Sequence, residues 1–209
     1  DDNSRSAWGA PSPDHRLLSY FGRVSYNYDE RYMAEFTLRR DGSSNFGPAH
    51  KWATFPSVSV GWNLTNEPFM ANRPKALSSL KLRASWGLNG NESIGSFHYI
   101  STVTGGADYI LGPEGLNTLV PGATPSGYPN DGLKWEESEQ FDAGIDASFF
   151  GNRLSLTVDY FNKRTNGMLM TVPLPQYIGN SRPYGNVGDM KNSGVETVSY
   201  THLRAHETG

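Results

Sequence analysis

The sequence predicts an all-β protein, and within that class a partial antiparallel transmembrane β-barrel of about six or seven strands, which forms an open sheet when isolated. Three observations support this prediction. The 209-residue chain contains 23 Gly and 13 Pro together with 5 Trp, 11 Tyr and 10 Phe, a composition that favours many strands and turns over a helical bundle. Apolar and polar residues alternate along several segments. The connections between these segments are alternately shorter and longer.

The alternation is clear in residues 18–28, where even positions are mostly apolar and odd positions mostly polar. Successive side chains of a strand point to opposite faces, so such a segment has one apolar and one polar face. The same pattern recurs in residues 32–39, 57–64, 80–89, 140–149 and 154–161. A seventh strand is expected to begin near Val195. The segments span about 8 to 11 residues, the length of a tilted strand that crosses a bilayer.

The connections support the same architecture. The first, third and fifth are tight or moderate and lie at residues 29–30, 66–79 and 151–152. The other three, at residues 41–52, 89–136 and 163–193, are longer. Outer-membrane barrels have short periplasmic turns and longer extracellular loops, so we expect the first group in the periplasm and the second outside. We expect an interfacial girdle from aromatic residues near the strand ends, including Tyr26, Tyr28, Tyr32, Phe149 and Phe150.

Composition excludes several classes of function. The net charge is -3, and 18 basic and 21 acidic residues are spread along the chain, so nucleic acid is not an expected partner. The absence of cysteine rules out disulfides and thiolate metal sites. No apolar run approaches the ~20 residues of a membrane-spanning helix. Residues 1–14 show no signal-peptide pattern, so we expect an exported protein to carry its N-terminus elsewhere.

No motif points to catalysis, and we expect no enzyme, cofactor or metal site. His202 and His206 have a helical zinc spacing but lack the glutamate of the zinc-protease motif. The other histidines, His15, His50 and His98, are expected at the surface without partners. Glu136, Glu137 and Glu139 near Trp135 suggest a glycosidase carboxylate pair, but neighbouring strand residues point in different directions, which favours a solvated loop edge. The aromatic and polar loops 41–47 and 177–184 either contact a sugar or peptide ligand or only shape the rim, and no substrate-binding residue is assigned.

Five stretches resemble SusC/RagA-type TonB-linked outer-membrane proteins of Bacteroidetes. They include SYFGRVSYNYDERYMAEFTLRRDGSSNFG at residues 19–47 and KWATFPSVSVGWNLTNEPF at residues 51–69. The others are residues 80–91, 133–169 and 186–196. The resemblance is weakest in residues 93–130. It implies a cell outer membrane location and a barrel of about 22 strands around a plug, of which residues 17–196 are a part and residues 1–16 a polar extracellular loop remnant.

The resemblance also implies a function. The whole protein is expected to import oligosaccharides or peptides, with a SusD-like surface lipoprotein as partner and the TonB complex acting through a plug and TonB box that have no counterpart here. Charged residues on the polar strand face are expected to wet the channel wall or contact the plug. These are Arg23, Glu35, Arg39, Lys81, Arg83, Asp142 and Asp146. The alternative is a soluble or surface-attached carbohydrate-binding β-sandwich.

The C-terminus departs from this pattern. VSYTHLRAHET, at residues 198–208, resembles the translation of a transposase adapter used in sequencing libraries. We therefore expect residues 197–209 to be a non-native tail and the natural seventh strand to be lost after Glu196.

Overall fold

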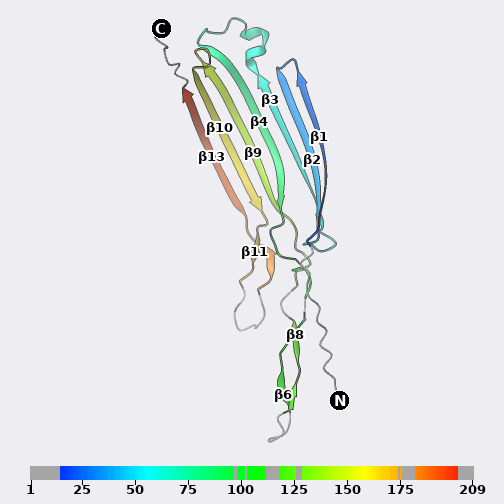
Figure 1. The fold of residues 1–209 in the computed structure, drawn as a ribbon. Helices are drawn as coiled ribbons and strands as arrows, with labels where there is room; N and C mark the ends of the chain where they lie inside the picture. Colours follow the sequence, from blue (N-terminus) through cyan, green and yellow to red (C-terminus); the bar gives the residue numbers. More distant parts are fainter. Residues whose placement is uncertain are drawn as a thin grey trace, which may run out of the picture.

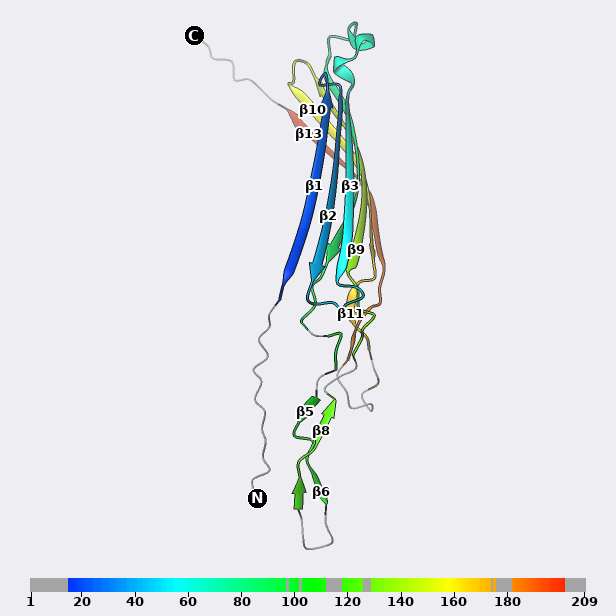
Figure 2. The same cartoon turned by 90° about the vertical axis from the view of Figure 1, so that its right-hand side faces the viewer.

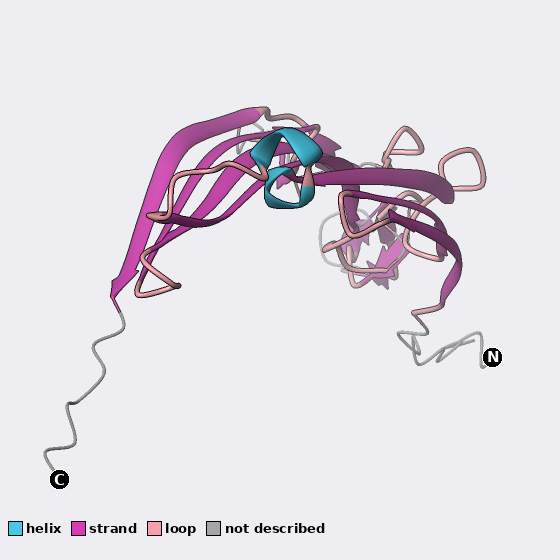
Figure 3. Cartoon of the chain, turned by 90° about the horizontal axis from the view of Figure 1, so that it is seen from above, coloured by secondary structure: helices cyan, strands magenta, loops and turns pink. Residues whose placement is uncertain are grey.

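The computed structural model describes residues 15–96, 98–101, 103–111, 118–125, 129–173, 175 and 182–201. Seven long strands form one antiparallel sheet in the order β1-β2-β3-β4-β9-β10-β13. The strands are β1 (Leu17–Tyr28), β2 (Tyr32–Ser43), β3 (Trp52–Asn63), β4 (Leu77–Asn91), β9 (Glu136–Phe149), β10 (Leu154–Asn166) and β13 (Met190–Thr201). Figures 1 and 3 show a single curved layer.

The prediction of an open antiparallel barrel sheet is confirmed. The alternative of a β-sandwich is wrong for the described part of the chain, because its seven-stranded sheet has no second large sheet packed against it. Large apolar side chains along the sheet stay exposed instead, with Val24 at 68%, Tyr20 at 60% and Val60 at 51%. A soluble sandwich would bury this face, whereas a barrel presents it to lipid.

The strands are longer than the alternating pattern predicts, at 12 to 15 residues. Most of the extra length lies at the loop end of the sheet. β3, for example, begins at Trp52 and contains Pro56, which pairs with Leu38 of β2. Proline has no N–H to donate, and the pairing of β3 with β4 starts only at Ser57. Pro56 therefore marks where the regular alternation begins, although the strand itself starts earlier.

The connections separate by length onto the two ends of the sheet, as Figures 1 and 2 show. One end carries the turns β1–β2 and β9–β10 and the β3–β4 connection with its short 3-10 helices η1 (Leu64–Asn66) and η2 (Pro68–Met70). The other end carries the three long connections. These contain the small strands β5 (Val103–Gly105), β6 (Tyr109–Leu111), β7 (Thr118–Val120), β8 (Ala123–Pro125), β11 (Leu169–Thr171) and β12 (Tyr184–Asn186). No helix in the described ranges is long and apolar enough to cross a membrane.

The small apolar core lies at the loop end of the sheet and not along its middle. It consists of Phe46, Phe55, Leu133 and Trp135, each no more than 5% exposed. The ring centroids of Phe46 and Phe55 lie 5.1 Å and 5.6 Å from that of Trp135. Leu169 and Tyr184 of the third long connection pack against this cluster, so the three long connections share one packed base.

The ends of the chain bear on the predicted boundaries. β1 begins at Leu17, where the barrel segment was expected to start, while residues 1–14 and 202–209, with His202 and His206, lie outside the described residues. β13 begins at Met190, earlier than predicted, because it pairs with β10 from Thr165 onward.

β13 also changes character at the predicted start of the tail. Its pairing with β10 places Thr197, Ser199 and Thr201 opposite Val158, Leu156 and Leu154, on the apolar face. Val198 and Tyr200 fall on the polar face. The two-faced pattern of the other six strands is therefore inverted from residue 197 onward. The non-native origin of residues 197–209 stays a prediction, and this inversion is consistent with it.

Candidate functional site

The polar face of the sheet gathers the charged side chains that the sequence places on one side of each strand. It carries the odd-numbered residues of β1 to β4 and β10 and the even-numbered residues of β9 and β13, and the apolar face carries the others. The seven charged residues expected on this face all lie on it: Arg23, Glu35, Arg39, Lys81, Arg83, Asp142 and Asp146. The structure therefore brings into one surface residues that are far apart in the chain.

Arg83 links three strands across this face. Its Nε lies 3.1 Å from Asp146 Oδ2 on β9, and its Nη2 lies 2.6 Å and 2.7 Å from the two carboxylate oxygens of Asp159 on β10. Thr157 donates a further hydrogen bond to Asp146 at 2.9 Å. The guanidinium passes over Gly144, where a Cβ would overlap Asp159 Oδ1 and lie 2.8 Å from Arg83 Cζ. Glycine at 144 is what lets this bridge form.

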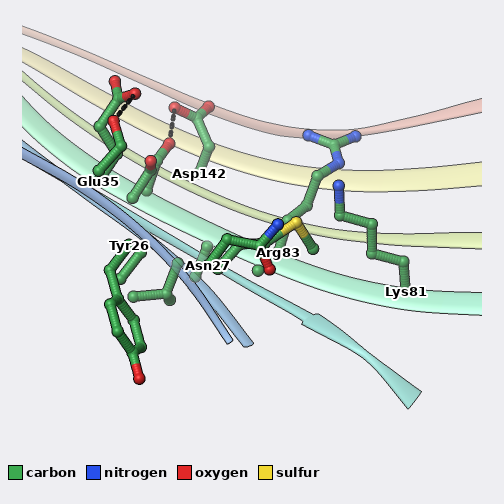
Figure 4. A pocket seen from close by; sticks show the side chains of 14 residues that line it. Tyr26, Asn27, Glu35, Lys81, Arg83 and Asp142 are labelled. Atoms are coloured by element: carbon green, nitrogen blue, oxygen red, sulfur yellow. Dashed lines mark hydrogen bonds between the residues drawn. The ribbon is translucent and has the colours of Figure 1, made fainter. Parts of the chain in front are cut away.

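A hollow of about 470 Å³ lies beside this bridge and is lined by residues of β1 to β4 and β9. Figure 4 shows Glu35, Arg83 and Asp142 on one side of the sheet, with Tyr26 projecting to the other. Ser25 donates a hydrogen bond to Glu35 at 3.1 Å, and Arg23 Nε lies 3.6 Å from the same carboxylate. The hollow offers both signs of charge and several hydroxyl groups beside apolar wall atoms of residues such as Met33 and Val60.

A second hollow, of about 650 Å³, continues the first toward the loop end. Arg39 forms part of its wall and is held by Asp41 at 2.8 Å and Asn89 at 3.2 Å. The same guanidinium lies 5.6 Å from the ring centroid of Phe55. The Phe55 ring covers Gly90, where a Cβ would overlap it. The packed cluster at the base of the long connections, called the loop base below, is thus in direct contact with the charged wall of this hollow.

Hydrogen bonds from three asparagines to backbone groups hold the long connections together. Asn45 reaches the carbonyl of Ile94 at 3.1 Å, and Asn130 that of Tyr184 at 2.9 Å. Asn186 both accepts from the amide of Lys134 and donates to its carbonyl, at 3.0 Å and 2.8 Å. Each bond joins two different connections, so the base of the loops is a fixed scaffold.

The loop segment 41–47 belongs to this scaffold. Six of its seven residues are buried, including Asp41, Asn45 and Phe46, which favours shaping the rim over direct ligand contact. Of the second candidate loop, residues 177–181 lie outside the described residues.

The apolar face carries aromatic residues at both ends. At the turn end, Tyr28, Tyr32 and Trp62 form a stacked row with centroid distances of 6.5 Å and 6.2 Å. At the loop end, Tyr20 stacks on Trp52 at 6.1 Å. Of the residues expected to form a girdle, Tyr28 and Tyr32 belong to this row, and the ring centroids of Phe149 and Phe150 lie 6.4 Å apart at the same end. Paired girdles around an apolar band are typical of membrane barrels.

The three glutamates near Trp135 do not form a catalytic pair. Glu136 lies on the polar face and accepts hydrogen bonds from Asn91 at 3.2 Å and from the Leu169 amide at 3.1 Å. Glu139 lies on the opposite face and accepts the indole N–H of Trp86 at 2.8 Å. Glu137 is exposed on the same face as Glu139. Both bonded carboxylates tie strands or loops together.

Two histidines differ from expectation, because they have partners. His98 packs against Tyr184 with tilted rings whose centroids are 4.4 Å apart, and burial lowers the pKa of its imidazole. His15 lies 3.1 Å from Glu92. Of the residues that the structure describes, no group of three or more His, Cys, Asp or Glu is placed to hold a metal ion.

At the turn end, Glu67 connects the β3–β4 connection to the first hairpin. It is 7% exposed, accepts the indole N–H of Trp62 at 2.9 Å and lies 3.8 Å from Arg31. The pKa of Glu67 is lowered, chiefly by a hydrogen bond from Tyr32 and then by that from Trp62. Alternation in the sequence identifies none of these contacts, since Glu67 lies outside the strands.

Comparisons with known proteins agree with this geometry. The sequence model described as "TonB dependent receptor-like, beta-barrel" matches residues 1–206. TonB-dependent receptor P3 of Formosa agariphila is 39% identical over 86% of this chain and 17% of its own length. TonB-dependent receptor SusC of Bacteroides thetaiotaomicron is 36% identical over 86% of this chain and 18% of its own length. The chain thus spans about a fifth of the length of these relatives.

Solved structures give the same result. The RagAB peptide transporter matches with a TM-score of 0.79 and 33% identity, over 92% of this chain and 20% of that one. The siderophore receptor PirA of Pseudomonas aeruginosa shares the fold, with a TM-score of 0.54 at 14% identity, over 88% of this chain and 30% of that one. These relatives are transporters and receptors by name, not enzymes. The chain belongs to the TonB-dependent receptor-like β-barrel family, as a segment of a SusC/RagA-type outer-membrane protein.

Proposed function

We propose that the complete protein imports an oligosaccharide or a peptide across the outer membrane. The observation that carries this proposal is the two-faced sheet, with ion pairs and hydroxyl groups on one face and an apolar band between aromatic rows on the other. In a closed barrel the first face lines a wet lumen and the second meets lipid. RagAB, a peptide transporter by name, supports a peptide, and SusC-type membership supports either ligand.

The partners follow from the same family. A SusD-like surface lipoprotein caps the loop end, and the TonB complex acts through a plug and TonB box on other parts of the protein. The fixed loop base, with the exposed ribbon β5–β8 projecting from it in Figure 2, suits contact with a partner or ligand above the membrane. The charges on the polar face line the channel or contact the plug.

The segment has a defined orientation in this proposal. Residues 17–196 form part of a barrel of about 22 strands, residues 1–16 belong to an extracellular loop, and residues 197–209 are a non-native tail. The long connections lie outside the cell and the short ones in the periplasm. This chain has no cysteine, so in a full-length protein freed of other cysteines a single introduced cysteine reports its side. Asp108→Cys should react with a membrane-impermeant maleimide on whole cells, and Glu30→Cys only after the outer membrane is broken.

Import is tested by deleting the full-length gene in its host. The strain should lose growth on one purified oligosaccharide or peptide mixture as sole carbon source, and deletion of TonB should cause the same loss. A complemented strain is the control. Undiminished growth on every such substrate, with a product found in the soluble fraction, would contradict import.

The glycosidase reading makes an opposite prediction. In that case Glu136→Gln or Glu139→Gln would abolish hydrolysis of a glycan by the purified protein. We expect no hydrolysis by the unaltered protein, since both carboxylates already hold structural hydrogen bonds.

A further inference from the structure

The aromatic boundaries of the apolar face reveal how the strands lie in the membrane. On β1 the boundaries are Tyr20 and Tyr28, and on β9 they are Phe141 and Phe149, eight positions apart in both strands. The pairing places Phe141 level with Val24 and Ile145 level with Tyr28. Both boundaries of β9 are therefore displaced by four positions toward the turn end relative to those of β1.

This displacement gives the tilt of the strands. Four strand-to-strand steps separate β1 from β9, so the boundary moves by one residue per strand on average between them, although Tyr28, Tyr32 and Trp62 of the first three strands lie level with one another. With ~3.3 Å per residue along a strand and ~4.8 Å between strands, the tilt is about 35°. Membrane barrels have tilts of about 35–45°. The next strand, β10, continues the pattern, because Tyr160 lies on the apolar face and its neighbours in register are Ala143 and Val195.

Two basic residues lie beyond this boundary on the same face. Arg164 is four positions past Tyr160 toward the loop end, and Lys191 pairs with Arg164 directly across the strands. Four residues of a strand tilted by 35° rise about 11 Å along the membrane normal. That distance places both Cα atoms outside the hydrocarbon, with side chains long enough to reach back to the headgroup layer.

The electrostatics of this pair indicate an anion. Like charges directly opposite each other destabilise a sheet unless something neutralises them. Both side chains are exposed, and within the described residues neither forms an ion pair. Glu139 lies directly opposite Arg164 on its other side and offsets one of the two positive charges, while its Oε1 accepts the Trp86 indole N–H; Glu137 lies farther toward the loops, so a net positive charge remains at the pair. In contrast, Arg23, Arg39 and Arg83 of the polar face each have a carboxylate partner.

We propose that Arg164 and Lys191 bind the phosphate groups of membrane lipids in the leaflet at the loop end. The site continues the lipid-facing band and lies at the depth of the headgroups, which argues for a lipid over a free anion. Electrostatic attraction of a basic residue near a membrane surface corresponds to about a fivefold change in affinity for each charge.

The test uses the purified full-length transporter in neutral detergent, titrated with dioleoylphosphatidylglycerol and followed by native mass spectrometry. Arg164→Gln with Lys191→Gln should weaken binding of the first lipids by about 25-fold, taking about fivefold for each of the two charges. The matched control is Lys163→Gln with Lys81→Gln, which removes the same charge from the polar face and should leave lipid binding unchanged. Arg164→Lys should retain most of the affinity.

Three outcomes would overturn the proposal. Unchanged lipid affinity in the Arg164→Gln, Lys191→Gln variant would show that these residues do not bind lipid. An equal loss of affinity in the control variant would show that the effect comes from the overall charge of the protein. Displacement of the lipid by millimolar inorganic phosphate would identify a free-anion site instead. Heat-modifiable mobility in gels checks that each variant is folded, and the single Lys191→Gln replaces the double variant if that one does not fold.

Discussion

Gly144 offers a sharp test of the bridge across the polar face. In Gly144→Ala the new Cβ would overlap Asp159 Oδ1 and lie 2.8 Å from Arg83 Cζ, so the guanidinium must leave Asp159 or the strands must separate. Arg83 then loses its bonds of 2.6 Å and 2.7 Å to Asp159, while its Nε can keep Asp146 at 3.1 Å. These groups are partly exposed, and an exposed ion pair contributes about 0.2–1 kcal/mol.

The alanine has an opposing effect, because replacing glycine stabilises a folded protein by about 0.4–1 kcal/mol through the unfolded chain where the backbone permits it. The change in unfolding free energy of the single variant is therefore a poor measure of the bridge, and a double-mutant cycle with Arg83→Met is needed. Without the guanidinium, Asp159 is free to rotate away from the new methyl group. Gly144→Ala should then be neutral or stabilising. The backbone effect of alanine is the same in both backgrounds and cancels in the cycle, so the coupling with Arg83 equals the free energy of the lost ion pair, up to about 1 kcal/mol.

The assay is urea unfolding of the full-length transporter in lipid vesicles, followed by tryptophan fluorescence. Ser148→Ala, on the same strand and face, serves as a control that should not couple to Arg83. Additive effects of the Gly144 and Arg83 substitutions, within about 0.3–0.5 kcal/mol, would refute the bridge as the reason for this glycine.

Three further predictions concern other parts of the sheet. Val60→Arg, on the apolar face, should destabilise the full-length barrel in vesicles by about 2–4 kcal/mol, whereas Ser59→Arg should cost far less. Phe55→Ala should cost about 3–5 kcal/mol and raise hydrogen exchange in the long connections, without affecting the short turns. The lowered pKa of Glu67 contributes stability that is present above the ordinary glutamate pKa and lost as pH falls through the lowered value, so Glu67→Gln should flatten unfolding profiles in the acidic range.

Each of these predictions has a contrary result. Equal costs for Val60→Arg and Ser59→Arg would mean that the two faces do not differ in solvent. Unchanged exchange in Phe55→Ala would show that the loop base is held by hydrogen bonds alone. An acid profile of Glu67→Gln that is parallel to that of the unaltered protein would show that this carboxyl does not titrate with folding.

The sequence predicts the sheet well because alternate residues of a membrane-barrel strand face lipid and water, and their polarity differs accordingly. Arg83, Asp142 and Asp146 are assigned to one face by parity alone, and pairing in register confirms them. Parity gives no information about which charges meet, since that depends on register between strands far apart in the chain. The Arg83–Asp159 contact, for example, joins residues 76 positions apart and requires the intervening glycine.

The loop base escapes prediction for a related reason. Phe46, Leu133 and Trp135 lie outside the alternating segments, and Phe55 falls on the polar parity of β3 although it is buried. Its environment is set by Pro56, which ends pairing with β4 and opens a space that the ring fills over Gly90. Such a cluster forms where three connections meet in space. None of these connections shows the periodic alternation of apolar and polar residues from which a buried position could be predicted.

The location of this core has a consequence for the energetics of the whole sheet. A soluble domain derives most of its stability from apolar side chains packed between layers, yet here the buried cluster has four members and lies beyond the membrane band. The apolar band, with Val24 at 68% exposure, gains stability only from contact with lipid hydrocarbon. The edge strands β1 and β13 are stabilised on their outer sides only when further strands of the barrel pair with them. In water these seven strands should therefore aggregate through their apolar face and edges, while the loop base keeps its local packing. Folding of the sheet and insertion into the membrane are thus one process, and the loops are the part whose structure depends least on lipid.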